Sequence, residues 1–267
     1  MIRDITIGQY YPAKSPIHRM DPRTKLFGTL IFIISVFLFH SVAGYAVATL
    51  FLAGMIIISQ VPVKFIFKGL KAIFMILMIT MVFNILLTPG EVLWKIGIFK
   101  ITREGISMAV RMAIRLVYLV IGSSLMTLTT TPNLLTEGLE KSLRPLNKIH
   151  IPVHEIAMMM SIALRFIPIL LEETDKIMKA QIARGADFES GNLIQKVKNM
   201  VPLLVPLFIS AFRRANDLAM AMEARCYHGG DNRTQMKPLR YTRRDHIAYV
   251  VLFVYLAVAI GFRVMGW

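Results

Sequence analysis

Long apolar runs alternate with shorter polar stretches along the first half of the chain. The first run extends from Leu26 to Phe39, breaks at His40-Ser41, and resumes from Val42 to Ser59. A membrane-spanning helix needs about 20 mostly apolar residues, so these two runs predict a helical hairpin. Later runs of similar character lie at 73–88, 106–128 and 247–266. The pattern therefore predicts an all-α, polytopic integral membrane protein with about five transmembrane helices.

Charged residues mix with apolar patches between the fourth and fifth predicted spans. Arg165 and Pro168 interrupt one patch, and Pro202 and Pro206 interrupt the other. Proline inside a helix removes a hydrogen bond and clashes with the preceding turn. We therefore expect long charged helices that start near these prolines, rather than full spans, and that cover about 168–185 and 206–226.

Four parts follow from this patterning. They are 1–25, an amino-terminal segment; 26–130, the amino-terminal membrane helices; 131–246, a coupling region with two Arg-tipped helices; and 247–267, a carboxyl-terminal membrane helix. Lys and Arg number 31 against 16 Asp and Glu, which gives a formal net charge of +15. Because cytoplasmic loops of membrane proteins carry the excess of basic residues, we expect the amino terminus and 131–246 to lie on the cytoplasmic side of the cell membrane.

The composition indicates which kinds of partner the basic residues bind. Hydrophobic residues make up 55% of the chain, well above the share in soluble domains. A nucleic-acid surface would interleave aromatic residues with the basic ones, and only Tyr227 and Tyr241 come near that pattern. We expect the basic residues to face lipid headgroups and acidic partner surfaces, with no nucleic acid bound.

Two short motifs repeat at the predicted helix ends. Ala183-Arg184-Gly185 ends the first charged helix, and Ala224-Arg225-Cys226 ends the second one 41 residues later. One interpretation is that each Arg is a solvated cation at the negative end of a helix dipole. The other is that each guanidinium docks in a groove of a partner protein, where its planar fork pairs with carboxylate and carbonyl oxygens. The repetition favours docking.

Two alternative functions make different demands on the sequence. A membrane enzyme could use His150, His154 and Glu155 around a metal, but Pro152 interrupts the helix face that would join them. A self-contained transporter or channel would place ionisable residues within its spans, yet no acidic residue occurs between Lys25 and Glu91. We therefore expect no enzyme activity and no catalytic, cofactor or metal site. The transporter or channel is the stronger of the two alternatives.

Three segments resemble a known family. They are "MDPRTKL" at 20–26, "ALRFIPILLEETDKIMKAQIARGADFESG" at 163–191, and "AMEARCYHGG" at 221–230. Together with the order of the spans, these segments resemble the transmembrane, or T, component of energy-coupling factor transporters, the EcfT family, which is related to the cobalt-transport protein CbiQ. The resemblance covers most of the chain.

The resemblance implies a scaffold without chemistry of its own. Two ABC-type ATPase subunits, EcfA and EcfA′, would bind ATP, and each would hold one Arg from the motifs at 183–185 and 224–226. ATP hydrolysis would then drive a separate substrate-binding membrane protein, the S component, to release a vitamin or metal ion inward. Cys226 stands where this family usually has glycine, which leaves the geometry of the second turn open.

Overall fold

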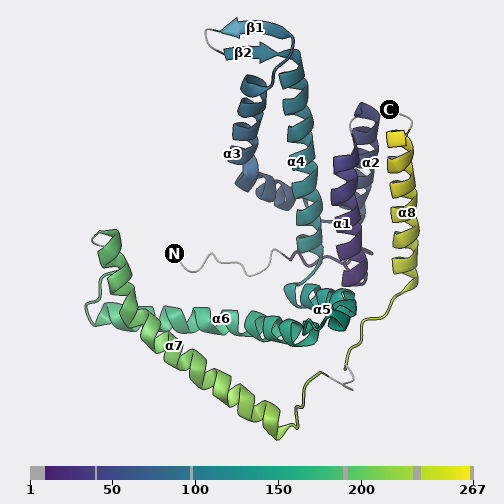
Figure 1. Ribbon diagram of the computed structural model, residues 1–267. Helices are drawn as coiled ribbons and strands as arrows, with labels where there is room; N and C mark the ends of the chain where they lie inside the picture. The colour runs from purple at the N-terminus through teal and green to yellow at the C-terminus, as the bar shows by residue number, and fades with distance from the viewer. Residues whose placement is uncertain (1–9, 40, 97–98, 189–191, 231–235, 265–267) are drawn as a thin grey trace. The chain divides into compact units, whose positions relative to one another are not determined.

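The computed structural model describes residues 10–39, 41–96, 99–188, 192–230 and 236–264 (Figure 1). Within these ranges the chain divides into two compact units. One unit contains residues up to Leu139 together with the segment from Leu239 onward, and the other extends from Glu140 to Pro238.

The first unit is built from membrane-type helices. Its elements are α1 (Pro22–Leu38), α2 (Val42–Ser59), α3 (Val63–Leu87), β1 (Val92–Ile96), β2 (Phe99–Thr102), α4 (Arg103–Thr129) and α8 (Arg243–Val264). The strands form an antiparallel hairpin between α3 and α4, and it is the only sheet in the described ranges. The all-α prediction is thus confirmed, with this hairpin as a small addition.

Local chemistry explains where the first helices begin. Asp21 caps α1 by accepting a hydrogen bond from the Arg23 amide at 2.9 Å, and Pro22 occupies the first turn, an arrangement that both residue types favour. Ser41 caps α2 in the same way, accepting from the amide of Gly44 at 3.2 Å. The polar break after Phe39 therefore separates two helices, as the sequence predicted.

Aromatic residues hold the centre of this unit together. Tyr255 of α8 stacks on Phe51 of α2, with 4.3 Å between ring centroids. The Tyr255 hydroxyl and Ser35 Oγ of α1 lie 2.7 Å apart, so a hydrogen bond crosses the buried interface. The surrounding core is apolar and contains Phe32, Val36, Phe39, Tyr45, Ala48, Leu52 and Ala259. These contacts bring α1, α2 and α8 side by side.

Four helices in the described ranges are long and apolar enough to cross a membrane. They are Val42–Ser59, Arg103–Thr129, Val153–Ala183 and Arg243–Arg263, and α3 makes a fifth if its two halves, bent by 57°, count as one span. The set agrees in number with the predicted five spans. It differs in membership, because α1 has only 17 residues and because the helix that begins at Val153 extends well upstream of Pro168.

The second unit consists mainly of two long helices. α5 (Pro132–Leu143) begins in the first unit and ends in the second, where a 3₁₀ segment, η2 (Arg144–Ile149), leads into α6 (Val153–Ala183), which α7 (Leu193–Ala224) follows. α6 and α7 end within two residues of the predicted ends at 185 and 226, but they begin well before the predicted starts at about 168 and 206. Pro168 lies inside α6, and Pro202 and Pro206 lie inside α7.

Candidate functional site at the two helix tips

The Arg184 tip has a defined backbone geometry. α6 ends at Ala183, with Arg184 as its C-cap and Gly185 in the left-handed region at φ +89°. The Gly185 amide donates to the Ile182 carbonyl at 2.9 Å, and the Ala186 amide donates to the Gln181 carbonyl at 3.0 Å. This pair of bonds is a Schellman motif, which satisfies the last carbonyls of the helix and turns the chain away after Arg184.

The Arg225 tip repeats this geometry. α7 ends at Ala224, Arg225 is the C-cap, and Cys226 takes the left-handed conformation at φ +55°. The Cys226 amide donates to the Glu223 carbonyl at 2.8 Å, and the Tyr227 amide donates to the Met222 carbonyl at 3.0 Å. The turn left open by the sequence is therefore the same at both tips, although a cysteine replaces glycine in one of them.

Both arginines reach solvent. Arg184 and Arg225 are exposed, as are the small residues Ala183 and Ala224 that precede them. In the described part of the chain, neither guanidinium has a hydrogen bond or ion pair to another residue. Each tip therefore presents a planar cation with its five N–H donors available to a partner.

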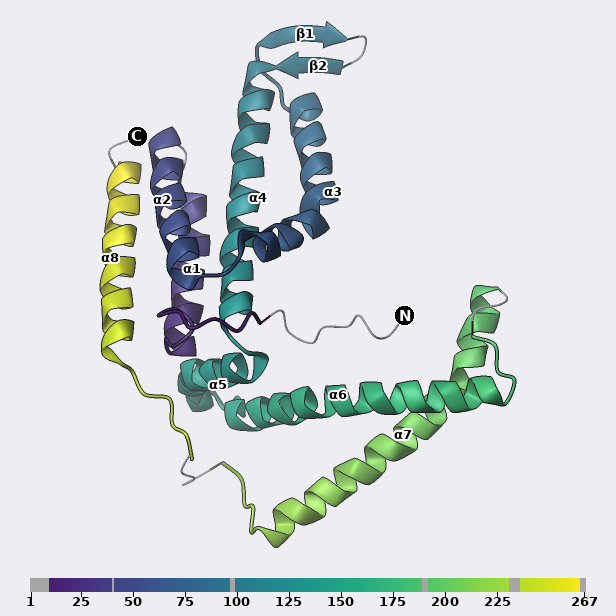
Figure 2. The ribbon, with the colours of Figure 1, turned by 180° about the vertical axis from the view of Figure 1, so that it is seen from behind.

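Polar contacts fix the crossing of the two helices, which both ribbon views show (Figures 1 and 2). The Arg214 guanidinium of α7 donates to Glu173 Oε2 of α6 at 2.8 Å, and Ser210 donates to the other oxygen of this carboxylate. Toward the end of α6, the Gln181 side chain donates to the Pro202 carbonyl at 3.4 Å. Later residues of α6 thus meet earlier residues of α7, so the helices run in opposite directions past each other.

Small residues open a crevice beside this crossing. Ala211, Ala215 and Ala219 of α7 face Phe166 and Leu170 of α6 around a cavity of about 260 Å³. Earlier in α7, a run of apolar side chains is exposed in the described structure. It consists of Leu204, Val205, Phe208, Ile209 and Phe212, and we call it the α7 apolar face.

The histidines considered as metal ligands have separate roles. His150 ends η2 in the left-handed region at φ +62°. His154 Nδ1 lies 2.8 Å from Glu140 Oε1, which makes this pair a local link between α5 and α6. No group of three or more His, Cys, Asp or Glu side chains suited to hold a metal occurs among the described residues.

A polar cluster at the start of α1 and α8 is absent from the sequence-based predictions. Asp245, which is fully buried, accepts hydrogen bonds from the Asp21 amide at 2.8 Å and from the Thr242 amide and hydroxyl at 2.7 Å each. Arg23 pairs with Asp21 at 2.9 Å and lies 4.0 Å from the Tyr241 ring centroid. The "DPRTK" segment thus caps α1 and also fastens it to α8.

The segment before α1 is held by a histidine. His18 Nδ1 lies 2.7 Å from Ser15 Oγ, and its Nε2 donates to the Tyr11 carbonyl at 2.9 Å. Burial lowers the pKa of the His18 imidazole, against the opposing effect of the Tyr11 hydrogen bond. The neutral ring satisfies both contacts, because it donates through Nε2 and accepts at Nδ1.

The shared turn predicts opposite effects of substitution at its two left-handed positions. A side chain in this conformation costs about 1 kcal/mol relative to glycine, so Gly185→Ala should loosen the last turn of α6, and Cys226→Gly should tighten that of α7. Hydrogen–deuterium exchange of peptides covering each tip should show roughly fivefold faster and slower exchange, respectively. Unchanged exchange at both tips would contradict the assigned turns.

Comparison with known proteins places these features in a family. Residues 13–236 match the family model described as "Cobalt transport protein", CbiQ. The chain is 57% identical over 266 residues to the "Energy-coupling factor transporter transmembrane protein EcfT" of Clostridium kluyveri, covering 99% of this chain and 98% of that protein. It is 48% identical over 264 residues to the protein of the same name from Bacillus subtilis, covering 98% of this chain and all (100%) of that protein.

Proposed function

Because this chain belongs to the CbiQ/EcfT family of energy-coupling factor transmembrane proteins, we propose that it couples ATP hydrolysis by two ABC-type ATPases to substrate uptake by a separate S component. The chain is a multi-pass membrane protein and a transporter component. The proposal assigns it no substrate chemistry and no cofactor of its own. ATP would be bound by the partners, and the vitamin or metal ion by the S component.

The paired tips are the observation that carries this proposal. Two helices of one chain end in the same turn, and each places at its C-cap an exposed arginine whose side chain has no partner among the described residues. A guanidinium recognises carboxylate and carbonyl oxygens in a fixed planar geometry. Two equal recognition elements suit two similar partners, so one ATPase subunit is assigned to each tip, with both tips on the cytoplasmic side.

The helices behind the tips are suited to transmit movement. α6 has 31 residues and α7 has 32, so each is about 45 to 48 Å long at 1.5 Å per residue. The Glu173–Arg214 ion pair joins α6 to α7. Displacement of one tip would therefore also move the other helix. The α7 apolar face groups five exposed apolar side chains on one helix, a feature typical of interaction surfaces, and we assign it to the S component.

Cross-linking from the tips tests the docking assignment. Cys226 is the single cysteine of the chain and is exposed beside Arg225. A benzophenone maleimide attached there, in membranes containing all subunits, should capture an ATPase subunit on illumination. The equivalent Gly185→Cys position in a Cys226→Ser background should capture the other subunit.

A cysteine in the middle of the rod provides the matched control. Arg213→Cys, also in the Cys226→Ser background, places the same reagent at an exposed position on α7 away from the tip. We expect little or no ATPase adduct from it. If Arg213→Cys captures the ATPases as efficiently as the tip positions do, or if the tips capture none, the docking assignment is wrong.

A further inference from the structure

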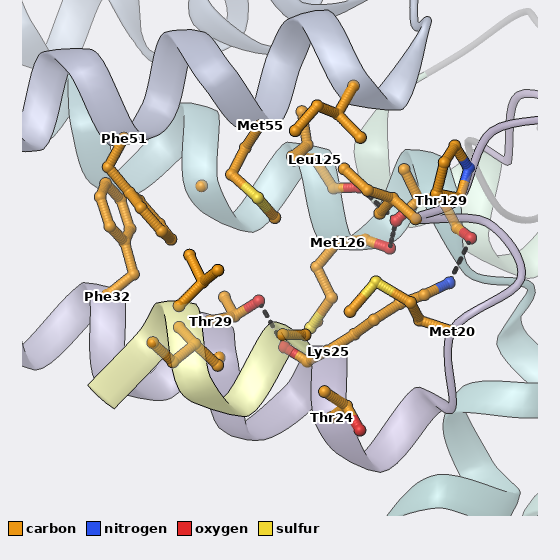
Figure 3. A pocket seen from close by; sticks show the side chains of 18 of the residues that line it. Met20, Thr24, Lys25, Thr29, Phe32, Phe51, Met55, Leu125, Met126 and Thr129 are labelled. Carbon is orange, nitrogen blue, oxygen red and sulfur yellow. Dashed lines mark hydrogen bonds between the residues drawn. The ribbon is translucent and has the colours of Figure 1, made fainter. Parts of the chain in front are cut away.

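A pocket of about 320 Å³ lies among the helices of the first unit (Figure 3). Its walls come from α1, α2, α4 and α8, with Pro16, Ile17 and Met20 closing one end. Pockets of this size hold small molecules or parts of larger ones. The docking tips belong to the other unit, so the function proposed above does not account for this pocket.

The lining changes from polar to apolar in the same direction along α1 and α8. Polar or charged residues line one end and are Thr24 and Lys25 of α1, Thr129 of α4, and Arg244 of α8. Apolar residues line the other end and are Phe32 of α1, Phe51 and Leu52 of α2, and Val251 of α8. From Thr24 to Phe32 the pocket extends about 12 Å along α1 at 1.5 Å per residue. The shape and polarity match an amphipathic ligand with a narrow apolar tail.

The charge at the polar end is positive. Lys25 and Arg244 line the pocket, and no Asp or Glu is among the described lining residues. The Lys25 ammonium is held by neutral groups, donating to the Thr129 carbonyl at 2.8 Å and to Thr130 Oγ1 at 3.2 Å, as Figure 3 shows for the first of these.

The acidic groups nearest this end are already engaged. Asp21 pairs with Arg23, and Asp245 accepts from Thr242 and from the Asp21 amide. Arg244, by contrast, is exposed, and no ion pair or hydrogen bond of its side chain occurs within the described ranges. A guanidinium is therefore available to a ligand at the mouth of the pocket.

We propose that this pocket holds one acyl chain of an anionic phospholipid, whose phosphate pairs with Arg244. The walls are helices of a membrane protein, so phospholipid is the amphipathic ligand present at the highest local concentration. The apolar end accommodates the chain, and basic groups between membrane helices attract anionic headgroups. Bound lipid would bridge α1, α4 and α8 at the level of the Asp245 cluster.

Native mass spectrometry of the purified full-length chain tests this proposal. Phosphatidylglycerol and phosphatidylcholine with identical palmitoyl and oleoyl chains are offered at equal concentration. We expect one phosphatidylglycerol to be retained in roughly fivefold preference, which corresponds to about 1 kcal/mol for a basic residue at the headgroup. Equal retention of the two lipids would overturn the assignment, because the headgroup would then have no role.

Variants of the chain test whether the lipid preference depends on this pocket or on positive charge in general. Arg244→Gln should abolish the preference, whereas Arg243→Gln, an equal charge change at the neighbouring exposed position outside the lining, should retain it. Ala248→Phe should fill the pocket and reduce retention of both lipids; if it does not fold, Met126→Trp fills the same space from α4. Equal losses from the two arginine variants, or full retention in a folded, filled variant, would refute the proposal.

Discussion

Replacing Arg184 and Arg225 together with glutamate is expected to abolish co-purification of the two ABC-type ATPases with this chain. Each substitution removes a planar cation from an exposed tip and places a carboxylate where the proposed partner groove holds carboxylate or carbonyl oxygens. Loss of a paired charge at a protein interface weakens binding strongly, and we expect roughly hundredfold weaker binding at each tip. Affinity purification from membranes containing all subunits, followed by quantification of each ATPase, measures the effect.

The single variants and a charge-matched control make this test specific. Arg184→Glu and Arg225→Glu alone should each reduce recovery of a different ATPase subunit. Lys176→Glu combined with Arg213→Glu makes the same change in net charge at exposed positions on the same two helices and should leave recovery unchanged. If this control loses the ATPases to the same extent as the tip variant, net charge explains the binding, and docking through the tips is excluded.

Asp245→Ala is expected to lower the stability of the first unit, which holds α1 to α4 and α8, more than any other single substitution of an acidic residue in that unit. The carboxylate is fully buried and accepts three hydrogen bonds, two of them from backbone amides at residues 21 and 242. Alanine would leave the buried Asp21 amide without a partner, at about 1 to 3 kcal/mol, and would also remove the acceptor of the two part-buried Thr242 donors. Even with partial relaxation, we expect a loss of about 3 kcal/mol, seen as a lower midpoint of thermal unfolding in detergent.

Two further variants test whether this loss of stability comes from the missing hydrogen-bond acceptor. Asp245→Asn keeps one carbonyl acceptor, so its unfolding midpoint should lie between those of the wild type and Asp245→Ala. Asp217→Ala removes an exposed carboxylate from α7 and should leave the midpoint essentially unchanged. An unfolding midpoint of Asp245→Ala equal to that of the wild type would show that the contact between α1 and α8 is dispensable.

Local signals in the sequence were sufficient for some helix ends. His40-Ser41 predicted the break between α1 and α2, and Arg184-Gly185 predicted the end of α6, because caps and left-handed turns depend on a few adjacent residues. The overall type of fold also followed, since spans of this length and hydropathy have few alternatives in a bilayer.

The sequence pattern predicts the starts of α6 and α7 too late, because a proline is a typical helix boundary. A proline within a helix costs about 3 kcal/mol, but this cost is small beside the packing and apolar surroundings of a helix of 31 or 32 residues. Pro168, Pro202 and Pro206 accordingly lie inside helices. A local rule about one residue was outweighed by the length of the apolar and amphipathic pattern around it.

Contacts between distant residues were beyond the reach of a single sequence. Asp245 bonds to the amide of residue 21, and Glu173 pairs with Arg214 on the following helix. Each residue taken alone has the appearance of an ordinary charged position at a helix end or on a helix surface. Only the folded chain brings the partners together, so the cluster at α1 and α8 and the link between α6 and α7 could not be predicted.

The Glu173–Arg214 ion pair also lies equally far from the Arg184 tip of α6 and the Arg225 tip of α7. Glu173 precedes Arg184 by the same number of residues as Arg214 precedes Arg225, so the pair occupies equivalent positions of the two helices. If the two helices rotate about this pair, the arm from the pair to each tip arginine is about 16 Å long at 1.5 Å per residue. A rotation of about 10° around it would displace each guanidinium by about 3 Å. Because the two arms are equal in length, equal displacements of the two tips by two ATPases would contribute equally to a change in the angle between α6 and α7.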